Sequence, residues 1–329
     1  MPLLQIENLS VKFKTDHGLV TAVDKFKFRI NPGQVIGVIG ESGSGKSVMA
    51  LAIADLLSPS AIAQADLFTL EGKDLNRMTA FERKRLITEN ISIIFQDPTS
   101  SLNPALTIGY QLDETVRSHG GGTPKQCRER SLELMASVGI KDAKRRYKEY
   151  PHQLSGGLNQ RVMIAMALAC KPKLLIADEP TTSLDVTVQS QILDLLMQLN
   201  QELDMALMLI THDFSILSET SEKVHVMYSG QVVESGQTYK LLTEPYHPYT
   251  KALLDSVPHF GMHYKKGRRL YNLPGSTPPM RHLPVGCNLG PRCPYASRQC
   301  VEMPQLRNLH GRQVRCHFPL IEEKVKGSS

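Results

Sequence analysis

The chain has 329 residues, 41% of them hydrophobic and 21% charged, a composition that excludes disordered and fibrous proteins. At roughly 100–200 residues per domain, this length predicts one large domain with an appendage, or two domains. The formal net charge of +6 is a modest excess that excludes no class of partner. No apolar run approaches the roughly 18–20 residues that cross a bilayer, and polar Gln5, Glu7 and Asn8 argue against an N-terminal secretory signal. We therefore expect neither a membrane span nor export.

Short runs rich in Val and Ile alternate with longer segments of helical spacing over about residues 35–233. This alternation predicts an α/β fold with a largely parallel sheet. Helical patterns replace the strands between about 108 and 151, around a glycine break at 120–122, so we expect a helical insertion. From about Glu244, closely spaced prolines predict a separate C-terminal module, in which we expect the basic run KKGRR (265–269) to be a solvated loop.

A glycine-rich loop, GESGSGKS at residues 40–47, follows the apolar strand QVIGVIG and precedes the helix formers VMALAIADLL. Glycines let backbone N–H groups converge on the β- and γ-phosphates of a nucleotide, and the following helix points its positive end at them. Lys46 would neutralise phosphate charge, and the Ser47 hydroxyl would bind Mg²⁺. The residues predicted to bind the nucleotide here are Gly40, Glu41, Ser42, Gly43, Ser44, Gly45, Lys46, Ser47 and Val48.

A second apolar strand, KLLIADEP at residues 173–180, ends in two carboxylates. In a phosphoryl-transfer site, Asp178 can hold Mg²⁺ through water, and Glu179 can act as the general base on the attacking water. Taken alone, two carboxylates at the end of a strand are as often part of a surface turn as of a catalytic site. Three further segments remove that ambiguity: LSGGLNQR (154–161), SLD (183–185) and LITHD (209–213).

Taken in order, the phosphate loop, FQDP (95–98), LSGG, DEP, SLD and THD resemble the motifs of an ATP-binding-cassette (ABC) ATPase over about residues 1 to 240. The resemblance implies an α/β P-loop NTPase fold: a RecA-like core, an antiparallel β subdomain, and a helical subdomain at about 97–160 that carries the signature motif. It also implies a cassette at 1–243 and a small Cys-rich extension at 244–329.

In this family two cassettes close head to tail, so that the signature segment of one covers the ATP bound to the other. The resemblance implies that Glu179 is the catalytic base, that His212 contacts the γ-phosphate and that Gln96 contacts Mg²⁺ or the attacking water. Phe13 would stack on the adenine. The remaining residues implied to contact nucleotide are Ser155, Gly156, Gly157, Gln160 and Asp185.

Outside the shared motifs, FQDPTSSLNP, YPHQLSGG, DEPTTSLDVT and HPYTKALL (247–254) resemble the ATPase subunits of bacterial dipeptide and oligopeptide importers, the dipeptide type most closely. The resemblance implies ATP-driven peptide import, a second ATPase subunit in a heterodimer, two transmembrane permease subunits gripped by residues 97–150, and indirectly a peptide-binding protein. It places the chain on the cytoplasmic face of the inner membrane, with no nucleic acid partner. Another cargo, such as nickel or antimicrobial peptides, and a soluble ABC ATPase without a transport role remain alternatives.

Four of the six cysteines lie in the proline-rich tail, whereas Cys127 and Cys170 stand alone in helical contexts. Because the cytosol keeps thiols reduced, four neighbouring thiols are better interpreted as metal ligands than as disulfides. Their gaps are wider than the two to four residues typical of zinc pairs, which favours a [4Fe–4S] cluster over Zn²⁺, and the resemblance to dipeptide-importer ATPases implies the same cluster. Cysteines that bind nothing remain an alternative. The predicted ligands are Cys287, Cys293, Cys300 and Cys316.

Overall fold

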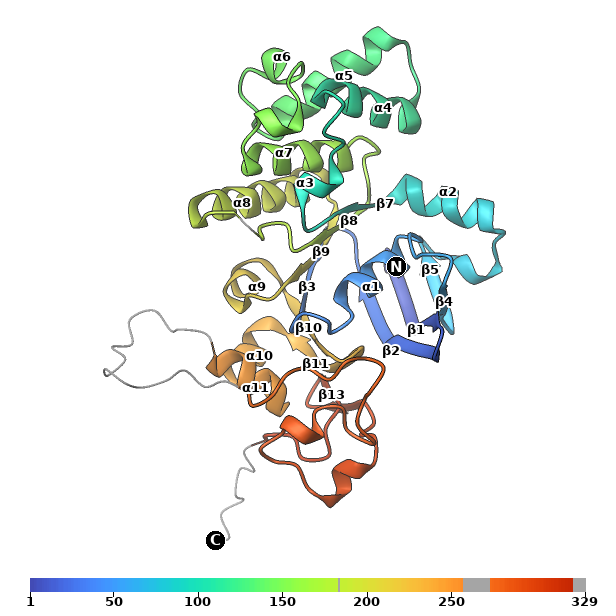
Figure 1. Cartoon of the computed structure of the whole chain (residues 1–329), viewed down its shortest axis with the longest axis vertical. Helices are drawn as coiled ribbons and strands as arrows, with labels where there is room; N and C mark the ends of the chain where they lie inside the picture. Colours follow the sequence, from blue (N-terminus) through green and yellow to red (C-terminus); the bar gives the residue numbers. More distant parts are fainter. Residues whose placement is uncertain (183, 257–272, 322–329) are drawn as a thin grey trace, which may run out of the picture.

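The computed structural model describes residues 1–182, 184–256 and 273–321, and two β-sheets organise this part of the chain (Figure 1). The larger sheet has eight strands in the order β12-β13-β11-β10-β3-β9-β8-β7. From β10 to β7 neighbouring strands run parallel, which confirms the predicted α/β class. Ser183 and the basic run at 265–269 lie outside the described residues. The strands are β3 (Val35–Ile39), β7 (Ile91–Ile94), β8 (Leu174–Asp178), β9 (Ala206–Thr211), β10 (Lys223–Tyr228), β11 (Gln231–Gln237), β12 (Arg307–Leu309) and β13 (Arg312–Val314).

The parallel strands are continuous apolar runs because the sheet is covered on both faces. Every residue of β3 is buried, and its successive side chains point to opposite faces of the sheet. Val35 and Ile39 pack into one hydrophobic core, and Ile36 and Val38 into the other. The strand that leads into the glycine-rich loop is therefore fixed from both sides.

The smaller sheet is antiparallel and packs beside the large sheet. Its two long strands pair over most of their length, and along much of each strand buried residues alternate with half-buried or exposed ones, as expected for a sheet with one solvated face. It is the antiparallel β subdomain that the resemblance implies. The strands are β1 (Leu4–Thr15), β2 (Gly18–Ile30), β4 (Ala61–Gln64), β5 (Leu67–Leu70) and β6 (Lys73–Asp74).

A group of helices forms one end of the molecule, at the top of Figure 1. The predicted glycine break separates two of them: α4 ends at Gly120, Gly121 has a φ of 64°, and Thr123 begins the next helix with a capping box and Pro124 in its first turn. These helices are α3 (Pro98–Ser101), α4 (Ile108–Gly120), α5 (Pro124–Ser137), α6 (Ala143–Arg146) and α7 (Gly156–Ala167), with a 3₁₀ turn η2 (Pro151–Gln153).

The remaining helices pack against the sheets, and in the described ranges none of the helices is long and apolar enough to span a bilayer. They are α1 (Lys46–Ile53), α2 (Ala80–Asn90), α8 (Val186–Leu203), α9 (Phe214–Thr220), α10 (Thr238–Thr243) and α11 (Pro248–Asp255), with 3₁₀ turns η1 (Leu75–Arg77), η3 (Gly290–Arg292) and η4 (Arg298–Val301).

The C-terminal extension continues the large sheet. Its strands β12 and β13 add to the edge strand β11, where Glu234 pairs with Val314 and Ser235 with Gln313. The predicted boundary between 243 and 244 thus separates segments that share one sheet, and it stays a prediction. Loops and 3₁₀ turns make up most of the rest of the extension (Figure 1).

Candidate active site

The glycine-rich loop lies between β3 and α1, which leaves residues 40–45 to turn the chain. Gly43 and Gly45 have φ angles of 77° and 97°, in the left-handed region that glycine adopts without strain. A Cβ atom on Gly40 would lie 2.2 Å from the carbonyl oxygen of Met227 on β10. The loop geometry therefore requires glycine for backbone reasons.

Lys46 folds back over this loop. Its Nζ donates hydrogen bonds to the carbonyl oxygens of Gly40 (2.8 Å) and Glu41 (3.1 Å), and lies 3.9 Å from Oε1 of Glu179. Burial lowers the pKa of the ammonium, while the charges of Glu179 and Asp178 raise it. A buried cation thus lies against the loop, where it could bind a phosphate.

Three predicted catalytic side chains meet at the carboxyl ends of three neighbouring parallel strands. Gln96 follows β7, Glu179 follows β8 and His212 follows β9. Gln96 Nε2 donates to Oε2 of Glu179 at 2.9 Å, and His212 Nδ1 lies 3.4 Å from the same oxygen. In open α/β sheets this edge is where ligands bind.

Glu179 has a φ of 48°, a left-handed conformation that is costly for a residue with a side chain. Thr182 Oγ1 donates to its Oε2 at 3.0 Å, so the carboxylate is held from several directions. This combination of backbone strain and a fixed side chain is typical of a functional residue.

Asp178, the last residue of β8, is 6% exposed. Burial raises the pKa of its carboxyl, against the opposing effect of a hydrogen bond with Ser47. Its Oδ1 atom is buried and has no hydrogen-bond partner in the described part of the chain. A buried carboxylate oxygen beside a serine hydroxyl fits the oxygen ligands that Mg²⁺ prefers.

Lys46, Gln96, Glu179 and His212 line one cavity of about 330 Å³, near the lower end of the range for small-molecule sites. Of the predicted nucleotide contacts, Gly40, Glu41, Asp178 and Phe13 do not line it. The lining residues are Ala22, Ser42, Gly43, Ser44, Gly45, Lys46, Ser47, Val48, Gln96, Glu179, His212 and Met280.

The signature segment, Ser155, Gly156 and Gly157 of the LSGG motif, lies apart from this cavity, at the start of α7. Ser155 caps the helix, with its Oγ accepting a hydrogen bond from the backbone N–H of Leu158 at 3.4 Å, and its side chain is exposed. Asp185 caps α8 in the same way through Val188. The two helix starts pack so closely that a Cβ on Gly157 would lie 2.6 Å from Cγ1 of Val188. The predicted residues that this single chain leaves away from the cavity are Ser155, Gly156, Gly157, Gln160 and Asp185.

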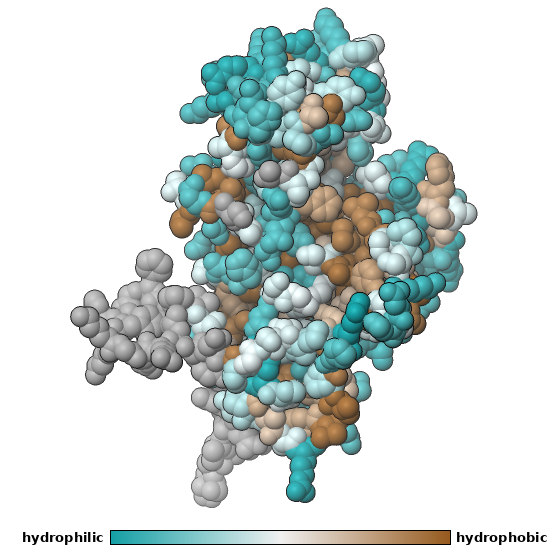
Figure 2. All heavy atoms as spheres, viewed as in Figure 1, coloured by the Kyte–Doolittle hydropathy of each residue, from teal (hydrophilic) through white to brown (hydrophobic). Residues whose placement is uncertain are grey.

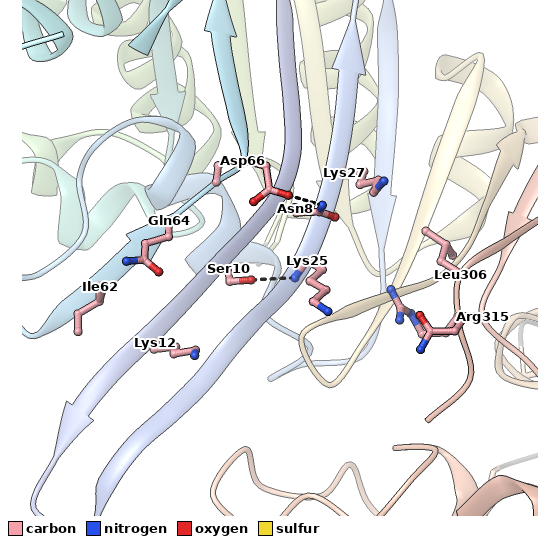
Figure 3. A pocket seen from close by; sticks show the side chains of 12 residues that line it. Asn8, Ser10, Lys12, Lys25, Lys27, Ile62, Gln64, Asp66, Leu306 and Arg315 are labelled. Atoms are coloured by element: carbon pink, nitrogen blue, oxygen red, sulfur yellow. Dashed lines mark hydrogen bonds between the residues drawn. The ribbon is translucent and has the colours of Figure 1, made fainter. Parts of the chain in front are cut away.

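A larger cavity, of about 790 Å³, lies between β1, β2 and the C-terminal extension (Figure 3). Lys12, Lys25, Lys27 and Arg315 line it together with a single carboxylate, Asp66, so its lining is strongly basic. None of the motif residues lines this cavity. Chemistry, not volume, therefore locates the active site at the glycine-rich loop.

Comparison with known proteins identifies the family. Residues 23–182 match the ABC transporter family, and residues 233–300 match the C-terminal region of oligopeptide/dipeptide transporters. The chain is 48% identical over 322 residues to the dipeptide transport ATP-binding protein DppD of Escherichia coli strain K12, covering 97% of this chain and 98% of that protein. The chain belongs to the ABC transporter ATP-binding proteins.

Other comparisons agree. This ABC protein is 43% identical over 329 residues to the peptide transport system ATP-binding protein SapD of Salmonella typhimurium, covering 98% of this chain and all of that protein. The ATP-binding cassette MJ0796, solved as a dimer in a post-hydrolysis state bound to ADP and Pi, matches with a TM-score of 0.63 at 27% identity, over 71% of this chain and 98% of that one. CbiO1 of Clostridium perfringens matches with a TM-score of 0.62 at 27% identity, over 74% of this chain and 91% of that one. The predicted fold and activity are confirmed: the chain is the ATP-binding subunit of an ABC transporter and an ATPase.

The four cysteines of the extension all line one small, enclosed pocket, together with His247 and Phe318. Burial raises the pKa of the Cys316 thiol to about 12, against a backbone hydrogen bond at Phe318, and the charges of the other three cysteines add to the rise. Yet no group of three or more His, Cys, Asp or Glu side chains within 1–182, 184–256 and 273–321 is arranged to hold a metal ion. The bound cluster therefore stays a prediction.

Sequence reasoning missed how the extension reaches the ABC phosphate loop. Arg292 donates to both carboxylate oxygens of Glu41, at 2.9 and 3.3 Å, and Thr277 also donates to this carboxylate. The hydroxyl of Tyr249 accepts the backbone N–H of Glu41 at 2.9 Å. Burial alone would raise the pKa of Glu41, but the bonds from Arg292 and Thr277 and the charge of Arg292 lower it. Tyr249 lies in the quoted motif HPYTKALL and Arg292 directly precedes the predicted ligand Cys293, but no spacing rule connects either residue to the loop.

Proposed function

We propose that this ATPase powers the import of dipeptides or oligopeptides, and that the cavity at the glycine-rich loop is where it binds and hydrolyses ATP. The observation that carries the proposal is the position of the Glu179 carboxylate between Lys46, Gln96 and His212 at the open edge of the parallel sheet. A fixed base beside a phosphate cradle is what hydrolysis of a terminal phosphate requires.

In this proposal residues 40–48 bind the β- and γ-phosphates, with Lys46 opposing their charge. Ser47 and the free oxygen of Asp178 would hold Mg²⁺, which when bound would neutralise charge on the phosphate oxygens. Glu179 accepts a proton from water as the water oxygen bonds to the γ-phosphorus and the bond to ADP breaks. Gln96 orients that water or the metal, and His212 donates to the γ-phosphate.

A second cassette is needed to complete each site. Ser155 and Gly156 are exposed at a helix start, where backbone N–H groups and the helix dipole suit an anion. In one chain they lie outside the phosphate cavity, so we infer that they cover ATP held by a partner, with Gly157, Gln160 and Asp185 supporting them. The partner is expected to be a different ATPase subunit. The dimeric state of the similar cassette MJ0796 supports such pairing.

The peptide cargo is inferred from the relatives, since the E. coli and Salmonella proteins are named as dipeptide and peptide transport proteins. Such a subunit would sit on the cytoplasmic face of the inner membrane, against two permease subunits and, indirectly, a peptide-binding protein. Figure 2 shows hydrophobic side chains gathered between the helical end and the antiparallel sheet. Three aromatic side chains near this recess are exposed and suit contact with the permeases: Phe81 on α2, Phe95 just after β7, and Tyr110 on α4. Tyr110 is the one that lies within residues 97–150, the segment expected to contact the permeases.

We further propose that Cys287, Cys293, Cys300 and Cys316 bind a [4Fe–4S] cluster, with Zn²⁺ as the alternative. The four cysteine side chains line one enclosed pocket, and four cysteines are the donor set of such a cluster. When bound, it would cross-link loops that share few apolar contacts of their own.

A single substitution tests the ATPase and transport roles together. Glu179→Gln keeps the shape of the side chain but removes the base, so ATP hydrolysis should fall about 100-fold to 10 000-fold while ATP binding persists and the closed dimer accumulates. Cells that lack this gene should regain uptake of a labelled dipeptide with the wild-type gene but not with this variant. Glu202→Gln, on the exposed face of α8, is the matched control. Full hydrolysis by Glu179→Gln would remove the assigned base, and unchanged dipeptide uptake in the deletion strain would remove the cargo.

A further inference from the structure

The C-terminal extension reaches the nucleotide cavity itself. Of the residues that line this cavity, Met280 is the one contributed by the extension. Gln96 and His212 lie against the carboxylate of Glu179 and mark the end of the cavity where the γ-phosphate reacts. Met280 belongs to the rest of the lining, with Ala22 of β2, whose carbonyl oxygen lies next to Gly45.

A second cavity, of about 460 Å³, adjoins the first and shares Met280 with it. One wall is the turn between β1 and β2, which contributes His17, together with the start of β2, which contributes Leu19 and Val20. The other wall is residues 280–282 of the extension. Strand β2 connects the two cavities, since it carries both Val20 and Ala22. The two cavities therefore adjoin at Met280, and a nucleotide whose phosphates lie on the glycine-rich loop could extend past this residue into the second cavity.

The position of Phe13 supports the same path. Phe13 does not line either cavity, but it pairs directly with Val20 across the antiparallel β1–β2 ladder. Residues directly opposite in such a ladder have side chains on the same face. The aromatic ring proposed to stack on adenine thus lies on the face of the turn that borders the second cavity.

The extension is also anchored firmly enough to form a wall. Arg292 is buried and holds both carboxylate oxygens of Glu41, which is itself part of the phosphate loop. The guanidinium Nε of Arg292 donates to the carbonyl oxygen of Pro274, and Thr277 bonds to Glu41 as well. These bonds fix the chain just before Met280 relative to the loop, so that residues 280–282 stand at a set position.

We propose that residues Met280–His282 form the outer wall of the base and ribose subsite for ATP, so that the extension completes the nucleotide site of its own chain. Val20 forms the inner wall, with Phe13 beside it on the same face of the β1–β2 ladder. The Met280 thioether packs on the purine, since sulfur contacts with aromatic rings are favourable. Arg281, which is exposed, stacks its guanidinium on the base or bonds to the ribose hydroxyls. This proposal rests on the ATP site proposed above.

Comparison of ATP with inorganic triphosphate isolates the base subsite. In the full-length chain, the double variant Met280→Ala, Arg281→Ala should bind ATP about tenfold more weakly, the scale of a lost stacking contact, and should bind inorganic triphosphate as tightly as the wild type. Arg298→Ala, an exposed arginine of the same extension that lines neither cavity, is the control and should change neither affinity. Unchanged ATP affinity in the double variant, or an equal loss for both ligands, would overturn the proposal.

A footprint on the unmodified chain gives an independent reading. Hydrogen peroxide oxidises accessible methionines to the sulfoxide, and mass spectrometry measures the rate at each residue. ATP should slow the oxidation of half-buried Met280 about fivefold or more, whereas inorganic triphosphate should not, with exposed Met303 as the internal reference. Equal oxidation of Met280 with and without ATP would also overturn it.

The phosphate loop has its own control, which separates this proposal from the one beneath it. Lys46→Ala should weaken ATP and inorganic triphosphate alike, because both depend on the phosphate cradle. If that variant bound ATP normally, the assigned nucleotide site would fail, whatever the extension contributes.

Discussion

The phosphate loop and the C-terminal extension meet at Glu41, but they are held in place by different kinds of contact. The loop is fixed by bonds that span five or six residues, from Lys46 to the carbonyl oxygens of Glu41 and Gly40. The extension is fixed by side chains far away in sequence: Arg292 is 251 positions from Glu41, and Tyr249 is 208. Local bonds depend on neighbouring residue types, whereas the distant ones exist only once the chain has folded.

The largest expected effect comes from removing one of the four cysteines, which should disorder the extension and leave the phosphate loop intact. Protein purified without oxygen should carry about four iron atoms per chain, and Cys300→Ser should lose most of that iron. Because the metal would cross-link segments with few apolar contacts, the variant should also become sensitive to proteases within residues 273–321. Iron and acid-labile sulfide analysis, with limited proteolysis, checks both results.

Cys170→Ser is the matched control, because Cys170 lies outside the cysteine pocket. Its Sγ atom contacts the hydroxyl of Ser92 instead. It should retain the full iron content. One zinc atom per chain and no sulfide would reverse the choice of metal. Metal-free protein with an ordered extension would contradict the ligand assignment.

The same contrast explains what could be predicted from the sequence. The loop at 40–47, Asp178 and Glu179 were predictable because each requirement is local: glycine where φ is positive, and carboxylates at the end of a buried strand. Gln96 and His212 followed from the order of motifs, and the structure brings them to Glu179 because β7, β8 and β9 are adjacent. The alternation of buried strands and helices likewise predicted the α/β sheet.

The roles of Met280 and Arg292 were not predictable, because no local pattern marks them. Met280 lies in a segment without regular secondary structure, and a methionine there is compatible with many environments. Arg292 precedes a predicted cluster ligand, so its charge suggested nothing about a glutamate in the phosphate loop. The continuation of the large sheet into β12 and β13 was missed for the same reason, since three-residue strands give too short an alternation to detect.

Breaking the Arg292–Glu41 pair should have an intermediate effect. Arg292 is 7% exposed as a side chain and Glu41 is 30% exposed, so the pair is only partly screened by water. Arg292→Met should lower the free energy of unfolding by about 2 kcal/mol, less than the loss for a fully buried pair because of that exposure. Urea unfolding of the single variants Arg292→Met and Glu41→Gln and of the double variant measures the coupling between them.

An exposed pair on α2 is the control for this cycle. Arg85 and Glu89 lie 2.8 Å apart at an i, i+4 spacing, but both side chains are more than half exposed. Their coupling should not exceed about 0.5 kcal/mol. If the two cycles gave equal couplings, the extension would not be anchored through Glu41, and its position beside the loop would need another cause.

The smallest expected change in stability concerns His225, a residue of the large sheet to which both the phosphate loop and the extension are joined. His225 on β10 is fully buried against Phe26 and Phe28, and burial, with a minor contribution from the charge of Lys223, lowers its pKa to about 3. An unfolded histidine has a pKa of about 6.5, so below that pH the unfolded chain takes up a proton that the folded chain does not. The stability that His225 contributes is therefore complete above pH 6.5 and is lost as the pH falls towards 3. Between pH 7.5 and 5.5 this loss should be about 1.4 kcal/mol.

His225→Leu should reduce that acid-dependent loss by the same amount, whatever it does to stability at neutral pH. His119→Leu, at an exposed position on α4, is the matched control. Urea unfolding at the two pH values measures both. An unchanged slope in His225→Leu would mean that the imidazole is protonated in the folded sheet. Such a charge would need a partner that neither the antiparallel sheet nor the neighbouring strands supply among the described residues, because both ring nitrogens are buried there without a hydrogen bond.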